Sequence, residues 1–230
     1  MIRSSGERAR YAGELIANKK QIAEHVTTRM YESPYWALRY GADGRRACVR
    51  DLVKTVEICA AAMRNGSPMI IDKHTPWLRG ILVDLGMSTV YLLQALGYLQ
   101  EHAAELLSPE ANEAFQPIFI SSMQAISHTD VRSKKILERA NQMVANIVRT
   151  MHTVSPFWQF RFGADAVRLC SVDIHFMIHY FVDALALDTK KGLLNHVPWL
   201  RGRFVTHLIT PAYLLDELDL VQAELGKVLT

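Results

Sequence analysis

The chain lacks the features that mark several specialised classes of protein. Only 3 of its 230 residues are cysteines, an odd number in a long chain, which excludes a disulfide framework and favours a reduced, cytoplasmic setting. Charged residues interrupt the apolar runs before they reach membrane-spanning length, and the N-terminus carries no apolar signal core. The formal net charge is only +3, with scattered basic residues. We therefore expect no nucleic-acid or membrane partner.

Signatures of catalysis and metal binding are missing as well. The sequence contains no catalytic triad arrangement, no glycine-rich phosphate loop and no repeated acid pair, so we do not expect an enzyme. His175 and His179 lie four residues apart, a spacing that would let both imidazoles face one metal ion. Because the sequence offers no obvious third ligand, we expect no metal site.

What the chain does contain is the material of a helical core. Half of its residues are hydrophobic and 21% are charged, which is typical of globular domains. Apolar residues recur at helical spacing, no stretch keeps the alternation of a strand, and an aromatic connector over 35–41 separates the first two helices. The sequence thus predicts an all-α fold of packed helices. The expected helices cover 8–31, 44–64, 67–86, 89–107, 109–126, 131–153, 166–187, 190–209 and 211–227.

Two stretches of the chain resemble each other at a fixed distance of 122 residues. HTPWLRG at 74–80 returns as HVPWLRG at 196–202, and all four tryptophans occur in pairs with this spacing. Residues 26–108 align with 148–230 without a gap, and about 26 of the 83 positions are identical. This similarity predicts a tandem duplication. We assign one module to 1–128 and a second, which lacks a final helix, to 129–230.

The repeated polar residues define a candidate binding site. Cys48 and Asp51 are three residues apart and share one helix face, and Cys170 and Asp173 repeat the pair. A thiol and a carboxylate flanked by arginines suit a ligand that has acidic groups and ring N–H donors. The alternative is core packing, because cysteine is among the residues most often buried.

The stretch from YGADGRRACVRD to the Leu-Gly at 85–86 resembles the phycobiliprotein family, as does the preceding helix. The resemblance covers most of 10–127 and, more faintly, 130–227. It implies a globin-like helical fold and a linear tetrapyrrole, or bilin, linked through a thioether to Cys48. In this family the matching Asp51 would bond the inner pyrrole nitrogens, and Arg50 would pair with a propionate.

The second copy departs from the family pattern at one position. Val172 replaces the arginine that would bind a propionate next to Cys170 and Asp173, whereas Arg168, the counterpart of Arg46, is kept and could substitute. The tandem arrangement is similar to that of diverged bilin-binding globins found outside light-harvesting complexes. The resemblance therefore implies pigment carriage, light absorption or sensing.

Haem binding is an alternative to bilin binding. His74 and His196 begin the repeated heptapeptide, and a neutral imidazole could ligate haem iron. Against this, each histidine lies two residues before a proline that we expect near a helix start. Trp77 and Trp199 could stack on a tetrapyrrole, although we favour core packing for both.

A chromophore-free scaffold is the third hypothesis, because a fold does not carry its function with it. An exposed aromatic connector, which includes Trp36, would then suit self-association. The missing last helix of the second copy predicts an apolar surface covered by another part of the chain, a second copy of the protein or a helical partner.

Overall fold

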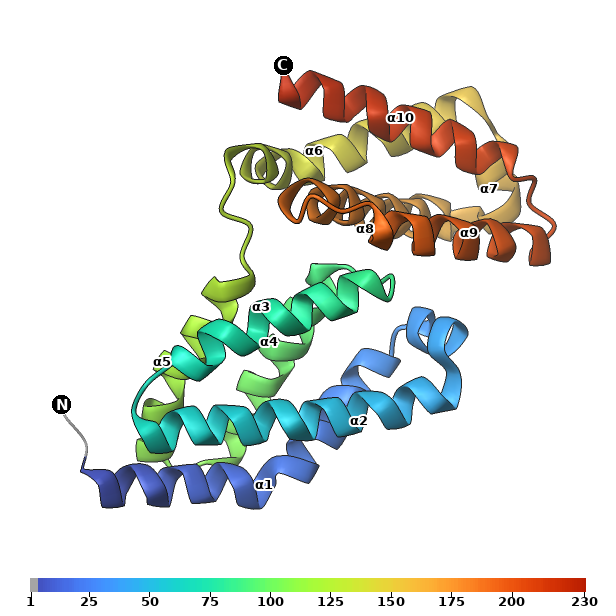
Figure 1. Cartoon of the computed structure of the whole chain (residues 1–230). Helices are drawn as coiled ribbons and strands as arrows, with labels where there is room; N and C mark the ends of the chain where they lie inside the picture. Colours follow the sequence, from blue (N-terminus) through green and yellow to red (C-terminus); the bar gives the residue numbers. More distant parts are fainter. Residues whose placement is uncertain (1–3) are drawn as a thin grey trace. The chain divides into compact units, whose positions relative to one another are not determined.

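The computed structural model describes residues 4–230, which fold into helices joined by short turns (Figure 1). No strand occurs among these residues, and the expected all-α class is confirmed. The elements are α1 (Ser5–Tyr31), α2 (Pro34–Asn65), α3 (Met69–Asp84), α4 (Thr89–Leu106), α5 (Pro109–Ile126), α6 (Val131–Val154), α7 (Phe157–Phe162), the 3-10 helix η1 (Gly163–Asp165), α8 (Ala166–Ala186), α9 (Lys191–Thr206) and α10 (Ala212–Leu229).

The chain divides into two compact units. The first comprises the residues up to Arg79 together with Val90–Ser127, and the second comprises Gly80–Thr89 together with His128–Thr230. The end of α3 and the turn after it therefore cluster with the second unit. The assignment of modules to 1–128 and 129–230 stays a prediction.

In the first unit, α1 and α2 run side by side (Figure 1). Helix α1 begins with a capping box, in which the Ser4 side chain accepts from the backbone of Glu7 while the Glu7 carboxylate accepts from the backbone N–H of Ser4. Leu15, Ile22 and Val26 follow at helical spacing and are fully buried. Their removal from water is the main force that holds this pair of helices together.

In the second unit, α6, α8 and α10 enclose one hydrophobic core (Figure 1). Each helix contributes an apolar stripe, represented by Ile147 on α6, Ile174 on α8 and Val221 on α10. The short helix α7 adds Trp158, which is buried against the same core.

The aromatic segment 35–41, which we expected to be a connector, is helical. It forms the first turns of α2, and the chain then breaks at Gly41 (φ 59°, ψ −158°) before the helix resumes. Gly163 makes the equivalent break after α7. Trp36 is only 5% exposed, so the expected exposure of this residue for self-association is wrong.

The two prolines of the repeated heptapeptide lie inside helices. Pro76 is within α3 and Pro198 is within α9, where we had expected helix starts. His74 and His196 accordingly occupy helical positions and not helix entrances. A proline inside a helix removes one backbone hydrogen bond, a cost that the packing of the helix must offset.

Aromatic contacts recur at the 122-residue step. Tyr35 stacks on Tyr91 with ring centroids 4.8 Å apart, and Phe157 stacks on Tyr213 at 4.5 Å. In each unit the neighbouring tryptophan meets the same tyrosine edge to face, with centroids 4.9 Å apart in the first unit and 5.4 Å apart in the second. The two segments thus place matched aromatic residues alike, and the tandem duplication itself stays a prediction.

Left-handed backbone positions recur at the same step. Gly66 and Gly86 have positive φ after α2 and α3, and 122 residues later Asp188 (φ 49°) and Leu208 (φ 57°) adopt the same region. Glycine adopts this region readily, whereas a residue with a Cβ is strained there, at about 1–2 kcal/mol. At these two matched positions the second unit has a similar left-handed backbone with residues that suit it less well than glycine.

One stretch has the length and composition of a membrane-spanning helix, contrary to our expectation from the apolar runs. Phe157–Ala186 reaches a mean hydropathy of 1.3 over its most apolar window. A core helix passes the same test, and this stretch consists of α7, η1 and α8 with the break at Gly163 inside it. Helix α8 packs one face against α6 and α10, as a core helix does.

Replacing the strained leucine by glycine should stabilise the second unit. Leu208 is 90% exposed, so Leu208→Gly removes backbone strain without removing packing. We expect the free energy of unfolding in urea to rise by about 1 kcal/mol. As a matched control, Leu215→Gly changes an exposed leucine inside α10 and should lower the same free energy by about 1 kcal/mol. Similar losses in both variants would contradict the assignment of strain.

Candidate functional site

The three cysteines differ in their accessibility. Cys48 on α2 is partly exposed, whereas Cys59 and Cys170 are 2% and 3% exposed. The Thr27 hydroxyl on α1 donates to the Cys48 sulfur over 3.5 Å. Burial raises the pKa of the Cys48 thiol, while the hydrogen bond from Thr27 acts in the opposite direction. Cys48 is consequently the cysteine that a reagent or ligand can reach.

Charged side chains surround Cys48 on the same part of α2. Arg50 and Asp51 are exposed, and partial desolvation raises the pKa of Asp51 while the charge of Arg50 opposes that shift. Arg46 forms an ion pair with Asp43 one turn earlier. Arg45 donates to the Thr28 hydroxyl over 2.9 Å. The arginines predicted from the sequence thus lie at the surface, where they can reach an acidic ligand.

The second copy arranges the matched residues differently. Cys170 belongs to the hydrophobic core, and burial raises its pKa to about 12. Asp173 as a whole residue is exposed to solvent. Protein atoms nevertheless surround its carboxyl group, and this desolvation raises its pKa to about 6. Arg168 pairs with Asp165 over 3.1 Å, which repeats the pair of the first copy. Val172 is exposed and offers no charge at the position of Arg50.

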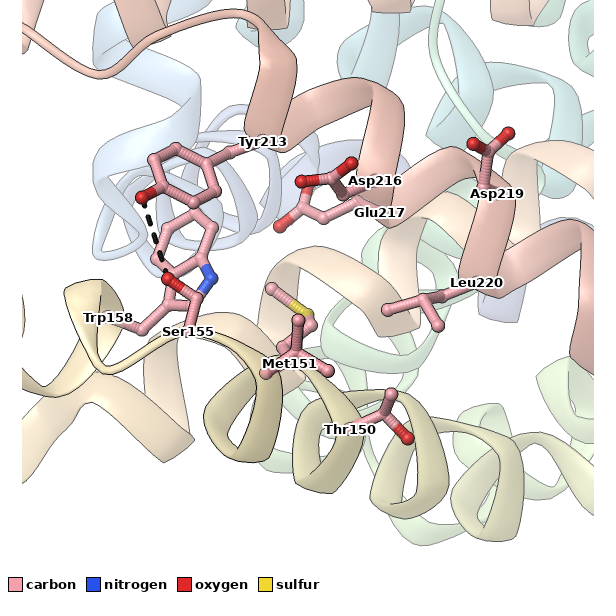
Figure 2. A pocket seen from close by; sticks show the side chains of 10 residues that line it. Thr150, Met151, Ser155, Trp158, Tyr213, Asp216, Glu217, Asp219 and Leu220 are labelled. Atoms are coloured by element: carbon pink, nitrogen blue, oxygen red, sulfur yellow. Dashed lines mark hydrogen bonds between the residues drawn. The ribbon is translucent and has the colours of Figure 1, made fainter.

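A pocket of about 330 Å³ lies in the second unit between α6, α7 and α10 (Figure 2). Apolar and aromatic side chains form most of its walls, and hydroxyl and carboxyl groups complete them. The pocket is within the usual size range of ligand sites, about 300–1,000 Å³. Its lining consists of Thr150, Met151, Val154, Ser155, Trp158, Tyr213, Asp216, Glu217, Asp219 and Leu220.

The acid Glu217, which sequence reasoning missed, is the most perturbed group of this pocket. It is only 2% exposed, and burial, reinforced by the nearby charge of Asp173, raises its pKa to about 8. The Glu217 charge in turn contributes to the raised pKa of Cys170. The pocket is therefore electrostatically linked to the second Cys–Asp pair. A sequence signal existed, because Glu217 falls on the apolar stripe of α10 between the buried Leu214 and Val221.

The residues of the repeated heptapeptide have different surroundings in the two units. Trp77 is 61% exposed, so the core position favoured for it is wrong, whereas Trp199 packs partly buried against the second core. His74 is half-buried and lies 5.5 Å from the Trp77 ring. His196 is buried and stacks on Tyr180 with ring centroids 4.1 Å apart. Haem ligation by these histidines stays a prediction.

Other polar groups of the second unit form a buried network around Asp183, in which Asp183 Oδ1, His128 Nδ1 and Thr89 Oγ1 make no hydrogen bond within the described part of the chain. Asp183 accepts from the Ser88 hydroxyl over 2.7 Å and from the Thr89 N–H over 2.8 Å, and its other oxygen is 3.3 Å from the His128 ring.

The ring nitrogens of His175 and His179 approach to 3.1 Å. Within residues 4–230, no group of three or more side chains could hold a metal ion.

The described residues thus form an all-α protein that carries a Cys–Arg–Asp element on α2. A family model described as phycobilisome protein matches residues 1–126, more than half of the chain. The chain belongs to this phycobilisome protein family, which confirms the resemblance inferred from the sequence. No curated protein and no solved structure matches the chain.

Thiol labelling should reveal the difference between the cysteines. In the native protein we expect iodoacetamide to modify Cys48 alone, and more slowly than free cysteine at pH 8, because burial raises its pKa. In denaturant all three cysteines should react. Mass spectrometry of tryptic peptides measures both results. Equal native labelling of Cys170 would contradict the burial of that thiol.

The buried acid should make stability depend on pH. Burial raises the pKa of Glu217 to about 8 in the folded chain, whereas the unfolded chain keeps the ordinary value of 4.5. Below pH 4.5 the acid is neutral in both states and does not lower the free energy of unfolding. As the pH rises from 4.5 towards 8, only the unfolded chain readily releases this proton, so the free energy of unfolding falls. Glu217→Gln should therefore gain on the order of 2–4 kcal/mol over wild type between pH 5 and 9.

Urea unfolding across this pH range measures the gain. The control, Glu224→Gln, changes an α10 acid whose pKa is lowered by hydrogen bonds from Lys227 and Asn146. This control should show no gain above pH 5. Parallel curves for wild type and Glu217→Gln would contradict the raised pKa.

Proposed function

We propose that the chain binds a linear tetrapyrrole, a bilin, at the Cys48 site and acts as a pigment carrier or light-absorbing protein. The observation that carries the proposal is the family match over 1–126, which contains a cysteine of suitable exposure. Sensing, light harvesting and storage would all use the same binding chemistry.

The residues around Cys48 fit the chemistry of such a pigment. A bilin carries propionates and pyrrole N–H groups, and the α2 surface offers Arg50 and Arg46 for the propionates and Asp51 for the N–H groups. Two of these groups would change when the pigment binds. Arg46 pairs with Asp43, and partial desolvation raises the pKa of Asp51. A bound pigment would exchange the first contact and favour the ionised form of Asp51.

Covalent attachment at Cys48 needs no oxidant. The thiol S–H adds across an exocyclic C=C of the pigment, so that sulfur bonds to one carbon and the proton passes to the other. Because the thiolate is the nucleophile, the Thr27 hydrogen bond and the charge of Arg45, which both favour the thiolate, assist the addition. Cys170 lies in the core, and we propose no covalent attachment there.

We also propose that the protein assembles with a second copy or with a helical partner. Family membership supports assembly, and α3 exposes Met69, Ile70 and Trp77 in the first unit. An apolar surface of this kind is suited to a protein contact.

The test is co-expression with a haem oxygenase and a bilin reductase. We expect a coloured protein whose pigment survives acid–urea denaturation and fluoresces with zinc. Cys48→Ala should lose the covalent band, whereas Cys170→Ala, the matched change at a buried thiol, should keep it.

The other outcomes of this test separate the alternatives. A bilin spectrum without covalent pigment would retain the binding site and refute the attachment. A Soret band lost in His74→Ala would replace bilin by haem. A colourless protein would leave a helical scaffold.

A further inference from the structure

The pocket between α6, α7 and α10 is not used by the proposed bilin site on α2, and its chemistry is different. Trp158 and Tyr213 form an aromatic wall, with ring centroids 5.4 Å apart at an interplanar angle of 62°. The Ser155 hydroxyl donates to the Tyr213 hydroxyl over 3.5 Å, which fixes this wall at the end of α6 (Figure 2). Met151 and Leu220 supply apolar surface opposite.

Glu217 is a buried acid, only 2% exposed, whose carboxyl oxygens are not among the fully buried unpaired atoms of residues 4–230 and so border the pocket. Figure 2 shows its carboxyl group extending from α10 into the space bounded by Trp158 and Met151. Burial of this carboxyl disfavours its ionised form. A ligand that donates N–H groups or carries positive charge would favour that form.

The rest of the lining has the same sign of charge. Asp216 and Asp219 are exposed at the pocket, and the lining contains no lysine, arginine or histidine. Negative groups beside aromatic faces are the combination that binds organic cations, because the ring faces also attract positive charge. An anionic ligand would meet three carboxyl groups and no compensating base.

The residues of the first unit at three matched sequence positions include a cation. The residues that lie 122 positions before Met151, Leu220 and Glu217 are Arg29, Tyr98 and Ala95. The Arg29 guanidinium lies over the Tyr98 ring at 4.6 Å from the centroid. At these positions the second unit has Met151 in place of the cation and the buried acid Glu217 in place of Ala95.

We propose that the pocket of the second unit binds an organic cation with a flat apolar body, such as an aromatic amine, with Glu217 as its counter-ion. The Trp158 and Tyr213 rings hold the apolar body, and Asp216 and Asp219 attract the charge to the entrance. This site goes beyond the proposed bilin site and does not depend on it.

Three naphthalene probes of matched shape test the charge preference. Isothermal titration at pH 7.5 compares 1-naphthylmethylammonium, the neutral 1-naphthylmethanol and the anion 1-naphthylacetate. We expect the cation to bind at least tenfold more tightly than the neutral probe and the anion to bind most weakly. Equal affinities, or no binding of the cation, would overturn the proposal.

Variants locate the binding to this pocket. Glu217→Gln should remove the tenfold preference for the cation, whereas Glu224→Gln, outside the pocket on the same helix, should keep it. Thr150→Arg places a guanidinium at the exposed edge of the pocket and should weaken cation binding at least tenfold. Thr153→Arg adds the same charge to α6 away from the lining and should leave the affinity within about twofold. An unchanged affinity in both Glu217→Gln and Thr150→Arg would refute the site.

Discussion

The backbone break at Gly41, with its counterpart at Gly163, is the constraint on which both candidate sites depend. A φ of 59° with a ψ of −158° belongs to a region that is essentially restricted to glycine. The break ends one helical segment after its aromatic residues and begins another that carries the Cys–Asp pair. It therefore lets Trp36 pack against Tyr91 while Cys48 stays partly open to a ligand. In a continuous helix the segment that carries Trp36 and the segment that carries Cys48 would share one axis.

The two copies share this break but differ in how far their matched cysteines are shielded from solvent. Cys48 borders α1 through the Thr27 hydroxyl and retains access to solvent, whereas Cys170 faces the core of the second unit. The same residue type thus serves as a reachable thiol in one copy and as a small apolar side chain in the other. Identity at a repeated position therefore does not establish the same role, and the surroundings of each sulfur decide it.

The sequence predicted most of the helices but little of the second site. Apolar periodicity and Ser-Pro or Asn-Gly signals located the elements, because these signals are local. Periodicity could not reveal that Pro76 is inside a helix or that 35–41 is helical, since proline and aromatic residues are poor helix formers whose cost is offset by packing. Trp77 was assigned to the core on residue type alone, although it is 61% exposed. Glu217 was missed because burial of an acid depends on which helices surround α10.

Three differences between the copies at or near the candidate sites change the charge in the same direction. From first to second copy, Arg50 becomes Val172, Arg29 becomes Met151 and Ala95 becomes Glu217, so two positive charges are lost and one acid is gained. A surface that retains arginines suits a ligand with carboxylates, and a pocket whose charged lining residues are all acids repels such a ligand. If the copies arose by duplication, the second has not simply lost a bilin site. Its residues instead support the proposed site for a ligand of opposite charge, because a cation beside the buried Glu217 would favour the ionised carboxylate.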